Sequence, residues 1–395
     1  MTRRLLVLAL VAAASSAAGG QAPTEPPRDA AAVPQASPRD SVRKGRARIL
    51  DSDDGQLDVS ALLENPRGFL PIPIVVTEPA VGYGGGLVGM FVRPRREAGA
   101  EGWARPDLSA VGVIATQNGT RALFAVDARR RVEGRLRTMA GAGTGTVNLD
   151  FYGLELDADR AVRYSLQFTG AVAQANWQLA PRSPWALGLR YVYSEVEPRL
   201  RDAPVFPFLV DRARVALSAP TAILEFDTRD NLFTPTRGVY GESSWLTSRE
   251  ALGASDNFER FQQILMGFRP LSHAVMFGAR ADYAWSSAGT PFFLQPFVQL
   301  RGVPAMRFRG SQMTSAEAEA RWQFVGRWSL VAFGGAGATR AGRDALAATA
   351  SVGSGGVGFR YQLARKFGLH AGIDVGHSAG TTALYFQVGN AWFRP

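Results

Sequence analysis

The residues best placed for acid–base chemistry are two glutamates, Glu317 and Glu319, in a strongly alternating stretch of the sequence. In an extended strand they share one face and lie about 7 Å apart, because each residue advances the strand by about 3.3 Å. Two carboxylates in such an arrangement can act as a general acid and a general base. Arg301, Arg307 and Arg321 are close in the sequence, so ion pairing inside the protein is the favoured interpretation.

Nucleophilic catalysis would need a histidine paired with an acid, and the chain contains His273, His370 and His377. His370 and Asp374 fall on one face of a predicted strand and form a suggestive pair. A hydrogen bond in the protein interior is the favoured interpretation of this pair. The sequence has no H-E-x-x-H motif or other close cluster of histidines and carboxylates that would predict zinc. We therefore expect no enzymatic activity, no metal and no cofactor.

Two segments match the G-x-G-x-x-G pattern of dinucleotide-binding loops, one beginning at Gly84 and one at Gly353. That chemistry requires the motif to follow a strand and open a helix, whose N-terminus then meets the pyrophosphate. Here the alternation of apolar and polar residues continues through both segments. The glycines are therefore predicted to lie inside strands, where they ease curvature or close approach.

The composition excludes several classes of protein. The chain has 395 residues, 43 glycines, no cysteine and a net charge of +10. A disulfide scaffold and thiolate metal sites are excluded by the missing cysteine. The positive charge comes almost entirely from single, scattered arginines, so we expect no nucleic-acid partner, whereas attraction to anionic lipid headgroups remains open.

The first 22 residues have the features of a signal peptide: Arg3 and Arg4, an apolar run from Leu5 to Ala14, and small residues up to Ala22. Residues 23–67 are rich in Pro, Ala, Arg and Asp and are predicted to be a disordered leader. Residues 68–395 are predicted to be one domain. No later segment contains 18 uninterrupted apolar residues, so we expect an exported protein without a transmembrane helix.

Strict alternation with period 2 runs from Pro79 to the C-terminus and predicts strands with one apolar and one polar face. A soluble β-sandwich is one interpretation. Aromatic residues near strand ends, opposite charges along the polar face and the export signal favour a transmembrane barrel instead. Segments such as Val162–Phe168 and Leu187–Tyr193 supply the predicted lipid-facing residues.

The alternation predicts about sixteen antiparallel strands. About eleven precede residue 287, with 161–169 and 171–180 counted as separate strands, and five follow residue 310. The segment Gly68–Glu78 contains Pro71 and Pro73, and is predicted to be an extended segment at the barrel mouth, or a surface loop, but not a strand. The charged loop that begins near Leu300 is predicted to fold inside the barrel before the last five strands.

Four segments resemble the bacterial surface antigen family of BamA/TamA-type outer-membrane barrels. The stretch EPAVGYGGGL resembles the first strand of that family, and LEFDTRDNLFTPTRGVYGE resembles a mid-barrel signature. LRGVP with the following RFRG and EAR resembles the lumen loop and the next strand. The closing strands are matched by GGVGFRYQL, GIDVG and YFQVGNAWF.

The resemblance implies a latch between the lumen loop and the barrel wall. Arg301 and Gly302 match the loop pair, and Phe333 matches a phenylalanine of the facing strand, whereas Val303 replaces an aromatic residue. Gly335 stands where the family places an aspartate that holds the loop arginine. Glu317 or Glu319 is the expected substitute, and Arg321 completes the Glu-x-Arg pattern. The mid-barrel signature matches at Asp227, Arg229, Asp230, Pro235, Arg237 and Gly238, and the C-terminal assembly signal at Trp392 and Phe393.

The resemblance implies an outer-membrane protein that works in protein assembly or transport. Outer-membrane lipids, the barrel-assembly machinery that would insert this chain, and a separate periplasmic protein are the expected partners. Assembly members of the family carry periplasmic repeat (POTRA) domains, for which the predicted leader leaves no room. A passive pore or a structural surface antigen therefore remains open as an alternative.

Overall fold

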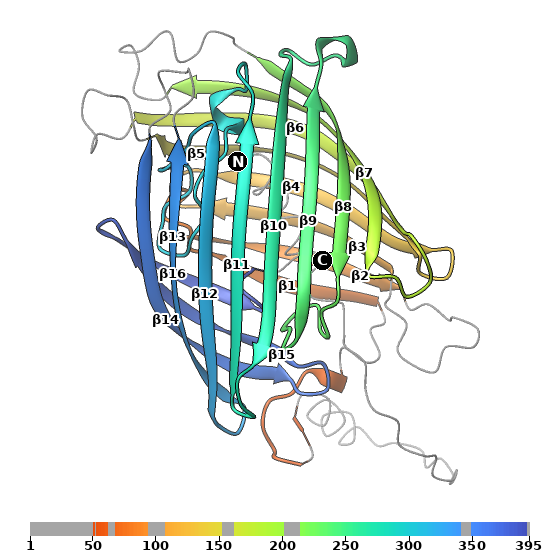
Figure 1. The fold of residues 1–395 in the computed structure, drawn as a ribbon, viewed down its shortest axis with the longest axis vertical. Helices are drawn as coiled ribbons and strands as arrows, with labels where there is room; N and C mark the ends of the chain where they lie inside the picture. Colours follow the sequence, from red (N-terminus) through yellow and green to blue (C-terminus); the bar gives the residue numbers. More distant parts are fainter. Residues whose placement is uncertain are drawn as a thin grey trace, which may run out of the picture.

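The computed structural model describes residues 50–51, 53–61, 68–93, 107–151, 162–200, 214–340 and 349–392. The predicted signal peptide, most of the predicted leader and Phe393 lie outside the described residues. Figure 1 shows the described strands wrapped around a common axis as a tilted barrel. In the described part of the chain, no helix is both long enough and apolar enough to cross a membrane.

Sixteen strands form one antiparallel sheet in which each strand pairs with the next along the chain, which confirms the predicted fold class. β1 and β16 lie next to each other, but among the described residues no strand pairing joins them. We call this boundary the seam. The strands are β1 (Gly68–Val76), β2 (Gly84–Arg93), β3 (Asp107–Thr116), β4 (Arg121–Arg131), β5 (Leu136–Phe151), β6 (Val162–Gln178), β7 (Trp185–Leu200), β8 (Val215–Asp227), β9 (Gly238–Ser248), β10 (Phe258–Pro270), β11 (Val275–Ser286), β12 (Gln312–Val325), β13 (Trp328–Arg340), β14 (Ala350–Ala364), β15 (Leu369–Ser378) and β16 (Thr381–Val388).

The two ends of the barrel differ in their connections. β1 begins and β16 ends at the same end, where β10–β11, β12–β13 and β14–β15 are joined by short turns. We call this the turn end; the β10–β11 turn lies at the bottom of Figure 1. The opposite, loop end carries the connection 287–311 between β11 and β12.

Burial reverses the pattern of a water-soluble protein. Leu189, Trp245 and Val357 are exposed on the outer face of the sheet, whereas Glu317 and Asp374 are buried on the inner face. An apolar outer face is what a barrel presents to lipid. The structure therefore fits the transmembrane barrel and not the soluble sandwich.

Two predictions about individual strands are wrong, and their effects on the strand count cancel. Gly68–Val76 is a strand despite Pro71 and Pro73, because it lies at an edge of the sheet and pairs only with β2. A proline is tolerated there when its missing N–H points away from the paired neighbour. Residues 162–178 form one strand, β6, where the sequence predicted two.

The inner face also carries apolar residues that the sequence assigned to lipid. Leu166 and Phe168 on β6 are buried in one cluster with Leu217 of β8, Leu246 of β9 and Phe297. Phe297 belongs to the connection 287–311, so this connection packs against inner residues of several strands. Alternation alone could not show which face of β6 meets lipid, because the connection supplies an apolar partner inside the barrel.

Candidate functional site

Arg301 reaches the barrel wall from the connection 287–311. Its backbone N–H donates to Glu317 Oε2 (3.1 Å), and its Nε donates to Glu317 Oε1 (3.0 Å). The guanidinium also lies over the ring of Phe333, 3.6 Å from the centroid. The structure therefore brings together Arg301, Glu317 and Phe333.

Two further carboxylates complete the surroundings of Arg301. Its Nη1 lies 2.7 Å from Glu319 Oε2 and 2.8 Å from Asp374 Oδ2. Asp374, from β15, also pairs with Arg360 of β14 at 2.5 Å. All of these side chains are buried. A buried charge is costly unless it is paired, and here two arginines share three carboxylates in one network.

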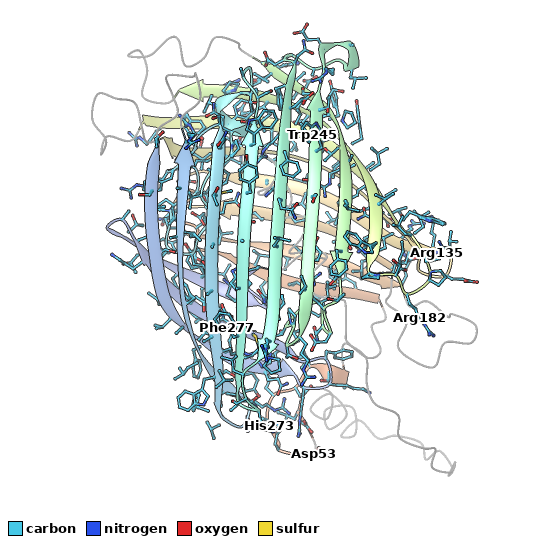
Figure 2. The ribbon with its side chains drawn as sticks, in the orientation of Figure 1. Asp53, Arg135, Arg182, Trp245, His273 and Phe277 are labelled. Carbon is cyan, nitrogen blue, oxygen red and sulfur yellow. The ribbon has the colours of Figure 1, made fainter. Side chains whose placement is uncertain are left out.

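The predicted His370–Asp374 pair is not the arrangement observed. Asp374 bonds the two arginines, and the Nδ1 atom of His370 lies 2.9 Å from the carbonyl of Gly368. The other two histidines are elsewhere: His273 lies in the β10–β11 turn (Figure 2), and His377 bonds Thr382. Among the described residues no group of three His, Cys, Asp or Glu side chains is placed to hold a metal ion.

The structure explains the glycine at position 335. Gly335 lies directly opposite Glu317 in the β12–β13 register. A Cβ atom at Gly335 would lie 2.6 Å from the carbonyl oxygen of Ala316 and 3.0 Å from Leu300 Cδ2. Leu300 thus occupies the space that an acid would need, and the acid stands across the ladder at Glu317.

Gly302 holds the connection close to the last strands. Its φ is +93°, and a Cβ atom there would lie 2.9 Å from backbone atoms of His377 on β15. Its N–H donates to the Tyr385 hydroxyl of β16 at 2.8 Å. Only glycine fits this conformation and this close approach.

Trp392 occupies a different place from the one predicted. β16 ends at Val388, so Trp392 does not lie on an alternating final strand. It is buried in a cluster with Met266 and Phe268, and its Nε1 donates to Glu317 Oε1 at 2.6 Å. The chain after β16 therefore returns into the barrel and joins the Arg301 network. Its role as an assembly signal stays a prediction.

The remaining predicted residues lie apart from Arg301. Arg321 faces inward on β12, two residues beyond Glu319, and the Arg301 network forms without it. The mid-barrel signature forms the β8–β9 turn, in which Arg229 pairs with Asp227 at 2.8 Å and covers the Tyr240 ring.

Asp230 accepts from the amides of Thr236 and Arg237 at 2.9 and 3.1 Å. Pro235 is buried in this turn, and Gly238 closes it with a φ of +102°. Asn231 donates to the carbonyl of Phe367 at 2.8 Å, and so links this turn to the β14–β15 turn. The signature thus shapes the turn end and presents no separate ligand site.

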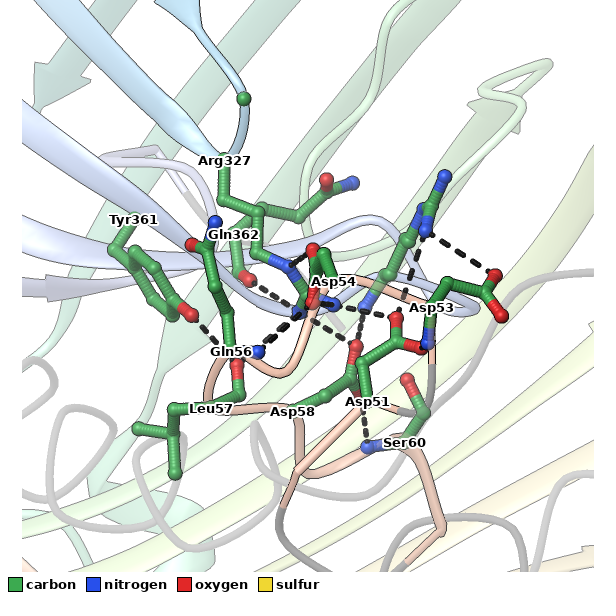
Figure 3. A network of polar contacts seen from close by, with 12 residues as sticks. Asp51, Asp53, Asp54, Gln56, Leu57, Asp58, Ser60, Arg327, Tyr361 and Gln362 are labelled. Carbon is green, nitrogen blue, oxygen red and sulfur yellow. Dashed lines mark hydrogen bonds and ion pairs between the residues drawn. The ribbon is translucent and has the colours of Figure 1, made fainter.

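Sequence reasoning missed one polar site. Asp51, Asp54 and Asp58 belong to the predicted disordered leader, yet each pairs with Arg327 of the β12–β13 turn (Figure 3). Residues 50–51 and 53–61 of the predicted leader therefore include carboxylates that bind a buried cation. The sequence signal was the concentration of four aspartates between positions 51 and 58.

The comparisons identify the class of fold. No protein-family model and no curated protein matches the chain. Among solved structures it is similar to BamA from Haemophilus ducreyi lacking POTRA domains 1–3, at 12% identity and a TM-score of 0.55, covering 80% of this chain and 69% of that one. It is also similar to CdiB from Escherichia coli, at 12% identity and a TM-score of 0.56, covering 80% and 61% of the two chains.

CdiB from Acinetobacter baumannii has a TM-score of 0.52 at 9% identity, with 81% of this chain and 59% of that chain covered. This chain therefore spans less than two thirds of both CdiB structures. At these identities the similarity shows the fold: a sixteen-stranded barrel like those of BamA and CdiB. The predicted resemblance is confirmed at that level.

Proposed function

We propose that this protein is an outer-membrane barrel that helps other proteins to enter or cross that membrane, acting at its seam. Bacterial outer-membrane barrels have short periplasmic turns and longer extracellular loops. The turn end would accordingly face the periplasm, where a separate periplasmic partner could deliver clients. The lipids of the membrane and the machinery that inserts this chain are the further partners of the proposal.

The observation that carries the proposal is the composition of β1 at the seam. Pro71 and Pro73 have no N–H, and residues two apart direct their backbone groups to the same side. Because β1 pairs continuously with β2 from Gly68 to Val76, the two missing donors are expected on the side of β16. The seam therefore lacks two donors that a closed ladder would use.

The residues packed inside the barrel favour the proposed function over that of a passive pore. The connection 287–311 packs Phe297 and Met306 against inner residues of β5 to β10. Arg301 joins that connection to β12 and β15, and Trp392 covers the inner side of β10. A lumen occupied in this way suits a barrel that works through its wall.

Restoring the missing donors tests the proposal. In vesicles that contain the purified protein, an unfolded test barrel should insert faster than in protein-free vesicles. The double substitution Pro71→Val and Pro73→Val should slow that insertion by about tenfold, since each regained hydrogen bond contributes about 0.5–1.5 kcal/mol to seam closure. Pro181→Val, in the exposed β6–β7 turn, is the matched control and should leave insertion unchanged.

Planar-bilayer conductance distinguishes the proposed function from the alternative of a passive pore. A passive pore would give a large, steady conductance, whereas the filled lumen should give none of that size. Equal insertion rates with and without the protein, together with a steady pore, would replace the proposal by the channel. Equal rates without a pore would favour a structural surface antigen.

A further inference from the structure

Residues 50–51 and 53–61, which we call the strap, bind one buried arginine with three carboxylates. Arg327 places Nη2 2.5 Å from Asp51 Oδ2, Nε 2.6 Å from Asp54 Oδ2 and Nη1 2.7 Å from Asp58 Oδ2. Figure 3 shows the aspartates converging on this single guanidinium. The five N–H donors of arginine suit such a site, whereas a lysine would offer only a point charge.

Backbone and apolar contacts extend the docking along β14. The Tyr361 hydroxyl donates to the carbonyl of Leu57 at 2.7 Å, and the N–H of Val59 donates to the carbonyl of Leu363 at 2.9 Å. The N–H of Lys366 donates to Ser60 Oγ at 3.2 Å. The strap is thus held at several successive residues, and charge attraction is one part of its fit.

The place of the strap in the chain gives this docking a mechanical consequence. The strap is anchored to β14 and to the β12–β13 turn, on the β16 side of the seam. The chain continues from Ala61 to β1, which begins at Gly68 on the other side of the seam. The covalent length of the chain between the strap and β1 therefore sets an upper limit on how far β1 can separate from β16 at the turn end.

The length of the chain between the strap and β1, compared with the distance it spans, gives the limit on the separation of β1 from β16. From Ser60 to Gly68 a fully extended chain spans about 28 Å, at roughly 3.5 Å per residue. Three strand spacings separate β14 from β1 across the seam, or about 14 Å. A docked strap therefore limits widening of the seam at this end to about 14 Å, and a released strap removes the limit.

We propose that the strap is a tether across the seam, fastened by Arg327, that restrains β1 and limits how far the seam opens at the turn end. The inference rests on the proposed function only for the claim that the seam opens for client proteins. The restraint itself is measurable without any client protein.

Hydrogen exchange of the full chain in lipid nanodiscs tests the tether. Arg327→Gln, and separately the pair Asp51→Asn and Asp54→Asn, should raise amide exchange in β1 by about tenfold or more, because each change removes hydrogen bonds to charged groups that hold the strap, and a released strap no longer limits the movement of β1. Exchange in β6 and β7 should not change. Arg249→Gln removes the Arg249–Glu259 pair, which lies between β9 and β10 at the loop end, and should leave β1 unchanged.

A disulfide rescue distinguishes a tether from a local effect of charge. The chain has no cysteine, so Ser60→Cys with Lys366→Cys adds a single pair at the observed Ser60–Lys366 contact. In the Arg327→Gln background, the oxidised protein should return to the wild-type exchange of β1, and the reduced protein should not. Unchanged β1 exchange in both release variants, or no recovery on oxidation, would overturn the inference.

The same samples separate this inference from the proposed function. Vesicle insertion that is absent in every variant, with β1 exchange responding as described, would remove the proposed function and leave the tether. Insertion that proceeds normally while β1 exchange ignores the strap would remove the tether alone.

Discussion

Single arginines organise the interior by each binding several carboxylates. Arg301 contacts Glu317, Glu319 and Asp374, and Arg327 contacts three aspartates of the strap. Desolvation of such ions is expensive, and close pairing with hydrogen bonds compensates for it. Removal of the shared cation should therefore cost more than the loss of one ordinary surface ion pair.

Arg301→Ala should destabilise the barrel on the order of 3–5 kcal/mol, because it leaves buried carboxylates without their cation. The folded form should then be lost at a lower temperature in heat-modifiability gels. Arg249→Ala, which removes a partly exposed pair, should shift that temperature little. An unchanged profile for Arg301→Ala would show that the network is not a structural latch.

Gly335→Asp supplies the acid that the family resemblance led us to expect. It should nevertheless destabilise the barrel by about 1–3 kcal/mol, because its Cβ meets the Ala316 carbonyl and Leu300. Thermal unfolding followed by circular dichroism measures the effect. The substitution Gly335→Ala, which adds the same Cβ atom without the acid, is the comparison and should also destabilise the barrel. A stabilised Gly335→Asp variant would contradict the assignment of Glu317 as the replacement acid.

Docking of the strap should weaken at acidic pH and should not change around neutral pH. A hydrogen bond from Arg327 lowers the pKa of Asp54; burial alone would raise the pKa of Asp58, but hydrogen bonds from Ser60 and Arg327 hold it below 3.8. Carboxylates with a lowered pKa stabilise docking above their free pKa, and that contribution is lost as pH falls through the docked pKa. Asp51, Asp53, Arg365 and Tyr361 are the other ionisable groups facing this site.

A spin label at Leu57→Cys measures this response. Its mobility should be the same at about pH 8 and about pH 5, and should rise below about pH 4. A transition near neutral pH would contradict the account, because it would require a group other than these carboxylates to control docking.

At the scale of strands, alternation predicted most of the architecture because period 2 follows from strand geometry. It predicted five strands after residue 310, where β12 to β16 lie, and it placed Glu317 and Glu319 on one face of the first of them. It failed at β1, where edge position overrides the usual effect of proline. It failed on the face of β6, because the partner of Leu166 and Phe168 is a connection more than a hundred residues later.

In the candidate site, too, some contacts were expected from the sequence and others were not. The family resemblance pointed to Arg301, Gly302, Glu317, Glu319 and Phe333 as parts of one latch between the loop and the next two strands. It did not predict that Asp374 and Trp392 enter the network, because those contacts depend on how the sheet closes. The strap was missed for the same reason: its partner, Arg327, is far away in the sequence.

The whole molecule combines an inner cluster that includes the connection 287–311 with a seam at which, among the described residues, no strand pairing joins β1 and β16. Arg301 and Trp392 contact Glu317 inside the barrel, and the strap docks on β14 and the β12–β13 turn at the turn end. In the proposed function, the interior is the rigid part of the barrel and the boundary between β1 and β16 is the adjustable part. The proposed assembly or transport role places clients at that boundary.

Site-specific photo-crosslinking tests this central claim most directly. Phe69 on β1, Phe386 on β16 and Leu189 on β7 are all exposed on the outer face, so each can carry a photoreactive residue with the same access to lipid. During insertion of an unfolded test barrel, crosslinks to that client should form at Phe69 and Phe386 and be weak at Leu189. Equal crosslinking at all three positions, or none at the seam, would contradict the account.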